Sequence, residues 1–156
     1  MLAVAAGVAQ WALTKGANRP PASRAAAAMA IGAASTTLAA TAARQFRRQG
    51  TTLEPSNPGL ASVLVTTGAH SVSRNPMYVG LTGLLVANAV RRGSWKALLP
   101  VAAFTLVIDR FQIAAEESAL LAIFAADYEA YRDGVPRWLG RRSVMPGPWD
   151  WRRATV

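Results

Sequence analysis

The sequence contains no cysteine and a single histidine, His70. Without cysteine the chain forms neither disulfide bonds nor thiolate metal sites, and one histidine cannot supply several imidazole ligands. We therefore expect no metal cofactor. Acidic residues are also scarce. The chain has 8 Asp and Glu and 17 Lys and Arg, and its formal net charge is therefore +9. The G-x-G-x-x-G turn and the strands of a Rossmann domain are missing as well, so we expect no such nucleotide-binding domain.

The 156 residues are about the size of one domain, and they are 52% hydrophobic and only 16% charged. A basic domain that binds nucleic acid would carry more charges of both signs, and a disordered basic tail would not be half apolar. Apolar membrane spans joined by basic loops account for both the hydropathy and the charge. The composition therefore predicts a small membrane protein that does not bind nucleic acid.

Four apolar blocks predict the membrane helices: residues 2–13, 25–43, 77–90 and 94–108. The first is short for a span of roughly 20 residues. The second has 11 alanines among 19 residues, and we expect it to pack on protein more than on lipid, because small residues let helices approach closely. We predict an all-α fold, an integral membrane bundle of about four transmembrane helices with a C-terminal amphipathic helix and no Rossmann domain.

The last helix is predicted to continue out of the bilayer to about Arg132, where Gly134 and Pro136 end it. On a straight helix at about 100° per residue, one stripe lies within about 60° of Glu117. Its other members are Leu106, Arg110, Ile113, Leu120, Leu121, Phe124, Tyr128 and Tyr131. The stripe is apolar apart from the two tyrosines, one arginine and one glutamate, so it predicts an amphipathic segment.

Basic residues predict the topology of the four spans. The long loop of residues 49–75 and both termini share one side of the membrane, and this side carries more arginine than the other. An excess of Lys and Arg is typical of the cytoplasmic side. We therefore expect both termini on that side.

Glu117 does not fit a plain helical bundle, because an unpaired carboxylate in an apolar stripe is costly. It pairs with Arg110, faces water at the mouth of the bundle, or contacts a ligand. Residues 74–78 open the third block with a second unusual feature. Asn75 and Pro76 are ordinary residues at a helix start, but that role does not explain the arginine and tyrosine on either side of them. The free N–H groups of such a helix start can also bind an anionic group.

His70 lies just before this helix start, and a lone histidine is structural, exposed or catalytic. Residues 64–80 resemble the signature of the isoprenylcysteine carboxyl methyltransferase family and its phospholipid methyltransferase relatives. In these families a T-G-x-[YH]-R-x-x-R-[NH]-P-x-Y-x-G segment opens a membrane helix. The family patterns E-E-x-x-L, F-G-x-x-Y-x-x-Y and V-P-R-W-L follow in order at residues 116–120, 124–131 and 135–139.

The resemblance covers roughly residues 50–140, with three departures. Ser71 stands where the family commonly has arginine, Ala125 replaces a glycine, and Asn75 replaces the histidine of the eukaryotic carboxyl methyltransferases. The similarity implies one domain over residues 1–156, made of a helical hairpin (1–48), a catalytic core (49–140) and an interfacial tail (141–156).

The resemblance implies an integral-membrane methyltransferase that uses S-adenosyl-L-methionine and releases S-adenosyl-L-homocysteine. The cofactor-binding residues that correspond by position are Gly68, His70, Arg74, Asn75, Pro76 and Tyr78 on one side of the pocket, and Glu117, Leu120, Tyr128, Tyr131 and Arg137 on the other. A methyl group on a sulfonium is already activated, so the enzyme mainly positions the reactants and excludes water. We expect Glu117 and Arg110 to serve catalysis, with Arg110 orienting an acidic substrate group because it shares the predicted stripe.

The acceptor is expected to be lipid-like or prenylated, with carboxyl O-methylation of an isoprenylcysteine-type substrate as the first hypothesis. Amine methylation of a phosphatidylethanolamine-type phospholipid is the alternative within the same class. A non-catalytic membrane scaffold is the alternative of another class. The expected location is a bacterial cytoplasmic membrane, crossed several times, with the active site on the cytoplasmic side.

Overall fold

The computed structural model of the chain describes residues 1–16, 19–48 and 63–144. Every regular element in these residues is helical, and they contain no strand. In chain order the elements are α1 (Leu2–Leu13), α2 (Ala22–Arg48), α3 (Ala69–Val72), α4 (Pro76–Arg92), the 3-10 turn η2 (Trp95–Ala97), α5 (Leu98–Val107), the π-helix η3 (Ile108–Ile113), α6 (Ala114–Gly134) and α7 (Arg141–Val144). The predicted all-α class is confirmed for this part of the chain.

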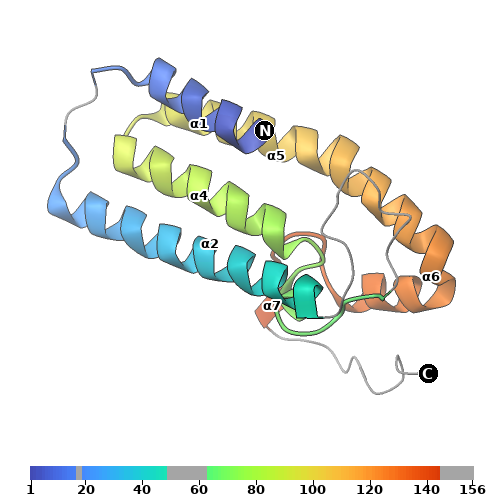
Figure 1. Ribbon diagram of the computed structural model, residues 1–156. Helices are drawn as coiled ribbons and strands as arrows, with labels where there is room; N and C mark the ends of the chain where they lie inside the picture. Colours follow the sequence, from blue (N-terminus) through green and yellow to red (C-terminus); the bar gives the residue numbers. More distant parts are fainter. Residues whose placement is uncertain (17–18, 49–62, 145–156) are drawn as a thin grey trace.

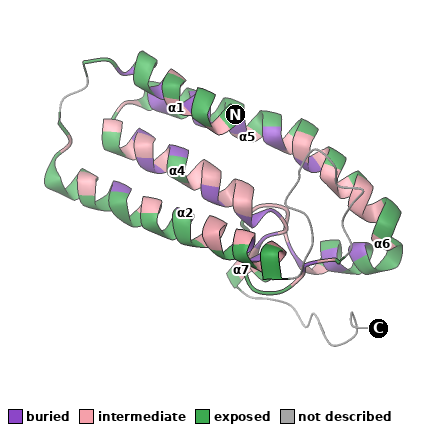
Figure 2. Ribbon diagram, viewed as in Figure 1, coloured by how far each residue is buried: buried purple, intermediate pink, exposed green. Residues whose placement is uncertain are grey.

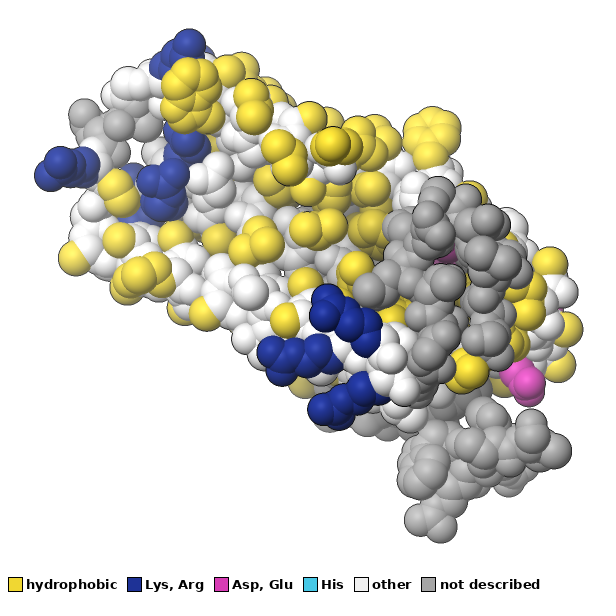
Figure 3. Space-filling model, viewed as in Figure 1, with side chains coloured by type: hydrophobic (Ala, Val, Ile, Leu, Met, Phe, Trp, Pro, Cys, Tyr) yellow, Lys and Arg dark blue, Asp and Glu magenta, His cyan; other side chains and the backbone are white. Residues whose placement is uncertain are grey.

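Helices α1, α2, α4 and α5 form an elongated bundle in which α4 lies between α2 and the pair α1 and α5 (Figure 1). The four helices coincide with the four apolar blocks of the sequence. Among the described residues, two helical runs are long and apolar enough to cross a membrane, Ala22–Arg48 and the continuous run Trp95–Gly134. Lys and Arg side chains form one group at the upper left of the visible face and a second group at its lower centre, and hydrophobic side chains lie between the two groups (Figure 3).

Helix α2 packs on α4 along a seam spaced seven residues apart, formed by Ala28, Ser35 and Ala42. Glycines make the approach close, since a Cβ on Gly80 of α4 would lie 2.7 Å from the Cβ of Ala39. The rest of α2 is largely exposed (Figure 2). The expectation that this alanine-rich helix packs mainly on protein is therefore wrong, because small side chains bury only the one face that meets α4.

Helix α1 forms hydrogen bonds to the rest of the bundle through Gln10, which is fully buried. Its Nε2 donates to the carbonyl oxygens of Leu85 and Ala97, each at 2.9 Å, and its Oε1 accepts a 2.7 Å bond from Asn88. A buried amide is tolerated when its donors and acceptor are satisfied in this way. The hydrogen bonds join α1 to α4 and η2 inside an otherwise apolar bundle.

The run Trp95–Gly134 turns sharply at Ala125, whose φ of 42° and ψ of −116° are not helical. The last part of α6 consequently folds back toward α7 (Figure 1). Ala125 is the residue that replaces the family's glycine, and positive φ is a conformation that glycine adopts at little cost. The helix ends at Gly134, as the sequence predicts.

Candidate active site

An ion-pair cluster joins the start of α4 to the chain that follows α6. Arg74 Nη2 lies 3.1 Å from Glu117 Oε1, and the two side chains are only 9% and 15% exposed. Arg137 approaches the same carboxylate with two donors, its Nε at 3.1 Å from Oε1 and its Nη2 on Oε2. Such a two-pronged guanidinium–carboxylate contact is directional and strong. The structure thus brings together three of the residues that the family resemblance singled out.

The Glu117 carboxylate is consequently shared by two guanidinium groups, and neither belongs to Arg110. The hydrogen bonds from Arg137 to Glu117 raise the pKa of Arg137 above its already high ordinary value. The pairing of Glu117 with Arg110 considered from the sequence is therefore wrong.

Arg110 itself points away from this cluster. Its side chain is 71% exposed and its charge partner is Asp109, at 3.7 Å. The straight-helix arithmetic placed it on the face of Glu117, but residues 108–113 form a π-helix, which turns the chain less per residue than an α-helix does. The predicted stripe is thus out of phase on the N-terminal side of Glu117.

Asp109, and not Arg110, lies beside the cluster of Arg74, Glu117 and Arg137. Its Oδ1 accepts a 2.7 Å hydrogen bond from Trp138 Nε1 and lies 3.3 Å from Arg137 Nη1. Arg137 therefore bridges two carboxylates. No motif or periodic pattern in the sequence marks Asp109, although its partners Arg137 and Trp138 lie in the V-P-R-W-L segment.

The segment around Arg74 is held in place by the backbone next to Arg137. Ser73 Oγ and Asn75 Nδ2 both donate to the carbonyl oxygen of Arg137, at 2.9 and 3.1 Å, and the Arg74 amide donates to the carbonyl of Pro136 at 2.9 Å. Asn75 occupies the N-cap position of α4, but its side chain makes no capping hydrogen bond. The predicted helix start is confirmed in position, with Asn75 at the N-cap and Pro76 in the first turn. The Asn75 side chain does not cap the helix, however, and instead joins the start of α4 to the segment after α6.

Tyr78, one turn into α4, contacts the other glutamate of the E-E pair. Its hydroxyl donates to Glu116 Oε1 at 2.6 Å, and Gln112 Nε2 donates to the same oxygen at 2.9 Å. Glu116 and Glu117 thus serve different partners, although they are neighbours in sequence. Pro76 occupies the first turn of α4 and is buried.

His70 is held on α3 by a residue that the sequence analysis missed. Its Nδ1 lies 3.3 Å from Gln45 Oε1 of α2, an acceptor, which favours the tautomer protonated on Nδ1. The ring of Phe46 meets the imidazole edge-on at 5.0 Å. Burial lowers the pKa of His70 to about 4, so the ring is neutral at physiological pH. Among the structural, exposed and catalytic roles left open by the sequence, these contacts match a structural role, and the burial of His70 excludes the exposed one.

Gln45 also shapes the turn before α3. Its Nε2 donates to the carbonyl of Thr67 at 2.9 Å and its Oε1 accepts the amide of Ala69 at 3.2 Å. Gly68 sits between them with φ of 59°, and a Cβ there would lie 1.9 Å from Gln45 Nε2. Gly68 is therefore required by the turn geometry, whereas no sequence pattern marks Gln45, which lies in the alanine-rich helix.

The two tyrosines of the predicted stripe form a second buried cluster with Val135. Tyr128 and Tyr131 are each 2% exposed, and the Tyr131 hydroxyl donates to the carbonyl of His70 at 2.7 Å. Leu120, Leu121 and Phe124 pack against them. The stripe prediction is correct that these residues gather, although the chain reaches that arrangement by turning at Ala125.

The Arg74 guanidinium retains two donors with no partner among the described residues, its Nε and its Nη1, and both are buried. Buried donors of a charged group are expensive to leave unsatisfied. A buried guanidinium with free N–H groups is a ready partner for an anionic ligand group. The described residues contain no group of three or more His, Cys, Asp or Glu side chains that could hold a metal ion.

Comparison with known proteins assigns the chain to a family. Residues 23–127, more than half of the chain, match the phospholipid methyltransferase family. The chain belongs to this family. A phospholipid methyltransferase is a membrane enzyme that acts on lipid-like substrates, and the long apolar helices of the chain agree with a membrane location. Arg74 and Glu117 lie inside the matched residues, whereas Arg137 lies beyond them.

A protein of Haemophilus influenzae, described as uncharacterized, is 43% identical to the chain over 63 residues. This stretch is 100% of that protein and 40% of the present chain. No solved structure matches the chain.

Proposed function

We propose that this phospholipid methyltransferase family member transfers a methyl group from S-adenosyl-L-methionine to a lipid-like acceptor, with the donor held beside Arg74 and Glu117. The supporting observation is the buried Arg74 guanidinium. Its Nη2 meets Glu117, whereas its Nε and Nη1 have no partner among the described residues. The carboxylate of the donor's amino-acid part suits those free N–H groups, and the Glu117 carboxylate suits a nearby positive charge.

When bound, the donor supplies a methyl group that is already activated by its sulfonium, so the transfer needs a positioned nucleophile more than an acid or a base. The chain's own residues then have three tasks. Arg74 binds the donor's carboxylate, Glu117 holds Arg74 and Arg137 in position, and the tyrosine cluster of Tyr128 and Tyr131 closes the adjoining interior to water. His70 is neutral and supports the turn that carries Gly68, so we give it a positioning role.

The topology proposed for this enzyme is a multi-pass bundle with four spans, α1, α2, α4 and α5, and with both termini on the cytoplasmic side. Helix α5 is part of the continuous run Trp95–Gly134 of 40 residues. Helices α1 and α4 have 12 and 17 residues, or about 18 and 25 Å at 1.5 Å per residue. Flanking Arg and Lys side chains can reach the interface from helices of this length. Under this topology the Arg74 cluster faces the cytoplasm.

The acceptor we propose first is a carboxylate on an isoprenylcysteine-type substrate, with Arg110 as the residue that meets it. The exposed position of Arg110 on the π-helix supports a contact with a substrate outside the bundle. The alternative acceptor is the amine of a phosphatidylethanolamine-type phospholipid, which the family description favours. Arg110→Gln should abolish transfer to a carboxylate and leave transfer to an amine largely intact.

The direct test is turnover of a methyl-labelled donor by the full chain in membrane lipid extracts, with the labelled products identified. We expect a labelled lipid with the wild-type chain and little or none with Glu117→Gln. The matched control is Glu129→Gln, because Glu129 is an exposed carboxylate on the same helix. A folded wild-type chain that binds no donor and labels no lipid would favour the scaffold alternative and overturn the proposal.

A further inference from the structure

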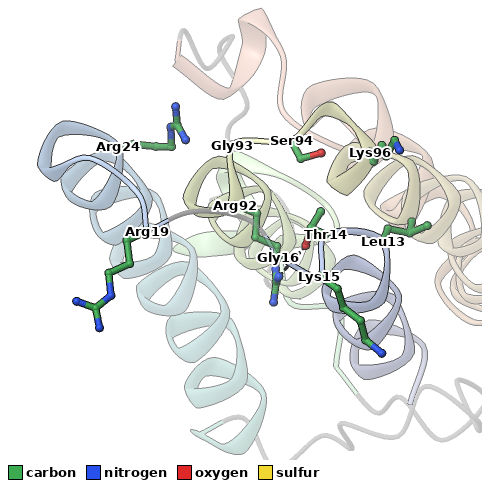
Figure 4. Close-up of a pocket in the computed structure, with 10 residues that line it drawn as sticks. All are labelled: Leu13, Thr14, Lys15, Gly16, Arg19, Arg24, Arg92, Gly93, Ser94 and Lys96. Carbon is green, nitrogen blue, oxygen red and sulfur yellow. Dashed lines mark hydrogen bonds between the residues drawn. The ribbon is translucent and has the colours of Figure 1, made fainter.

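A second feature lies at the opposite end of the bundle from Arg74. Helix α4 starts next to Arg74 and ends at Arg92, and its 17 residues separate the two places by about 25 Å. At this far end a pocket of about 430 Å³ opens between the end of α1, the start of α2 and the α4–η2 turn (Figure 4). The pocket is therefore independent of the proposed methyl-transfer site.

Five of the residues that line the pocket are cationic: Lys15, Arg19, Arg24, Arg92 and Lys96. No lining residue is acidic. The sequence explains this imbalance, because all eight Asp and Glu lie at position 54 or in residues 109–150. Helices α1, α2, α4 and α5 thus carry no carboxylate that could neutralise the pocket, and the compensating charge has to come from another molecule.

Arg92 lies at the centre of the pocket in Figure 4, with its Nη1 donating to Thr14 Oγ1 at 2.6 Å. The Thr14 hydroxyl in turn donates to the carbonyl oxygen of Gln10, at 2.6 Å. Arg92 Nε is buried and has no partner among the described residues. A guanidinium fixed on one side and unsatisfied on the other is prepared to bind an anion.

The pocket is also placed where a membrane surface would be. Trp11 and Trp95, next to it in sequence, are 53% and 69% exposed, and Lys15 Nζ lies 4.5 Å from the centre of the Trp11 ring. Exposed tryptophans beside basic residues at the end of apolar helices are typical of the membrane interface. An anion at this level is most readily supplied by the surrounding lipid.

We propose that this pocket binds the phosphate of an anionic phospholipid headgroup, and that the bound lipid stabilises the packing of the end of α1 and the start of α2 against the α4–η2 turn. Arg92 holds the phosphate at the centre and the other four cations surround it. This inference does not depend on the proposed methyl transfer, since the pocket shares no residue with the Arg74 cluster.

The test measures lipid binding by the full chain purified in detergent. Phosphatidylglycerol is titrated into the micelles, and the lipid retained is counted by native mass spectrometry while the unfolding temperature is followed. We expect phosphatidylglycerol to bind and to raise the unfolding temperature more than zwitterionic phosphatidylcholine does. Inorganic phosphate forms a separate arm, and an equal rise with inorganic phosphate alone would show a free-anion site and overturn the lipid assignment.

Variants locate the binding. Arg19→Gln with Arg24→Gln removes two exposed pocket cations and should weaken phosphatidylglycerol binding by a factor of about five for each cation. The matched control is Arg47→Gln with Arg48→Gln, which removes the same charge from the far end of α2 and should leave the affinity unchanged. Lys96→Gln provides a second pocket variant if the first does not fold. Equal losses in the pocket and control variants would show non-specific attraction and overturn the proposal.

Discussion

Arg74 and Glu117 form an ion pair of 3.1 Å that is largely shielded from water. The pair connects the start of α4 with the first turn of α6, and Arg137 completes it from the segment after α6. Its asymmetry matters for function, because Glu117 contacts two guanidinium groups while two buried nitrogens of Arg74, Nε and Nη1, have no partner among the described residues. The cluster is therefore a firmly positioned cation with unused donors, which suits an anionic ligand.

Ala125→Gly should stabilise the protein. Alanine at φ of 42° carries a steric cost that glycine avoids, so we expect a gain of about 1 kcal/mol in the free energy of unfolding. Ala122→Gly is the matched control, because Ala122 is an exposed, helical residue three positions earlier and should lose about 1 kcal/mol. Thermal unfolding of the three proteins in detergent measures both effects. A loss of stability in both variants would contradict the turn described at Ala125.

Gly68→Ala should destabilise the turn before α3. The added Cβ meets Gln45 Nε2 and is forced into positive φ, so we expect a loss of about 2 kcal/mol or more. Adding Gln45→Ala removes the side chain that the new Cβ meets, and it should recover the part of the lost free energy of unfolding that is due to this contact. The double variant should therefore be more stable than the sum of the two single losses predicts. Gly7→Ala, where a Cβ meets nothing within 4 Å, should not destabilise the protein. Strict additivity of the two losses would argue against the contact between Gln45 and the turn.

Stability should fall in mild acid because of His70. Its pKa in the folded state is about 4, below the ordinary value of 6.5 that applies to the unfolded chain. Between these values the unfolded chain takes up a proton that the folded chain does not, so the contribution is complete above about pH 6.5 and is lost as the pH falls toward 4. The largest loss from this group is about 3 kcal/mol.

The measurement compares unfolding temperatures between about pH 7.5 and about pH 5 for the wild type and His70→Gln. The variant should be less sensitive to pH over this range, since it lacks the only histidine. Identical pH profiles for the two proteins would mean that His70 is not buried in its neutral form.

The helices could be predicted from hydropathy because they follow the apolar blocks, and the C-terminal stop at Gly134 follows from its glycine and the proline after it. The approach of Arg74, Glu117 and Arg137 was accessible through family resemblance, because the three lie in motifs that keep their order. Periodicity alone would not have joined residues on separate elements.

Two parts of the site were not accessible in this way. The position of Arg110 was wrong because stripe arithmetic assumes one constant turn per residue, and neither the π-helix at residues 108–113 nor the positive φ at Ala125 obeys it. The role of Gln45 depends on where α2 ends relative to α3, a tertiary contact that leaves no trace in the local pattern. The predictions for residues 49–62 and 145–156, including most of the interfacial tail, lie outside the described residues.

Calorimetric titration of the full chain with S-adenosyl-L-homocysteine tests the central claim most directly, using Arg74→Lys. Lysine keeps a charge for Glu117 but lacks the Nε and second Nη donors of the guanidinium, so affinity should fall about tenfold or more. The matched control is Arg44→Lys, because Arg44 is exposed and lies near the C-terminal end of α2. This variant should bind as the wild type does. Binding of Arg74→Lys at wild-type affinity, or no binding by the folded wild-type chain, would contradict the account.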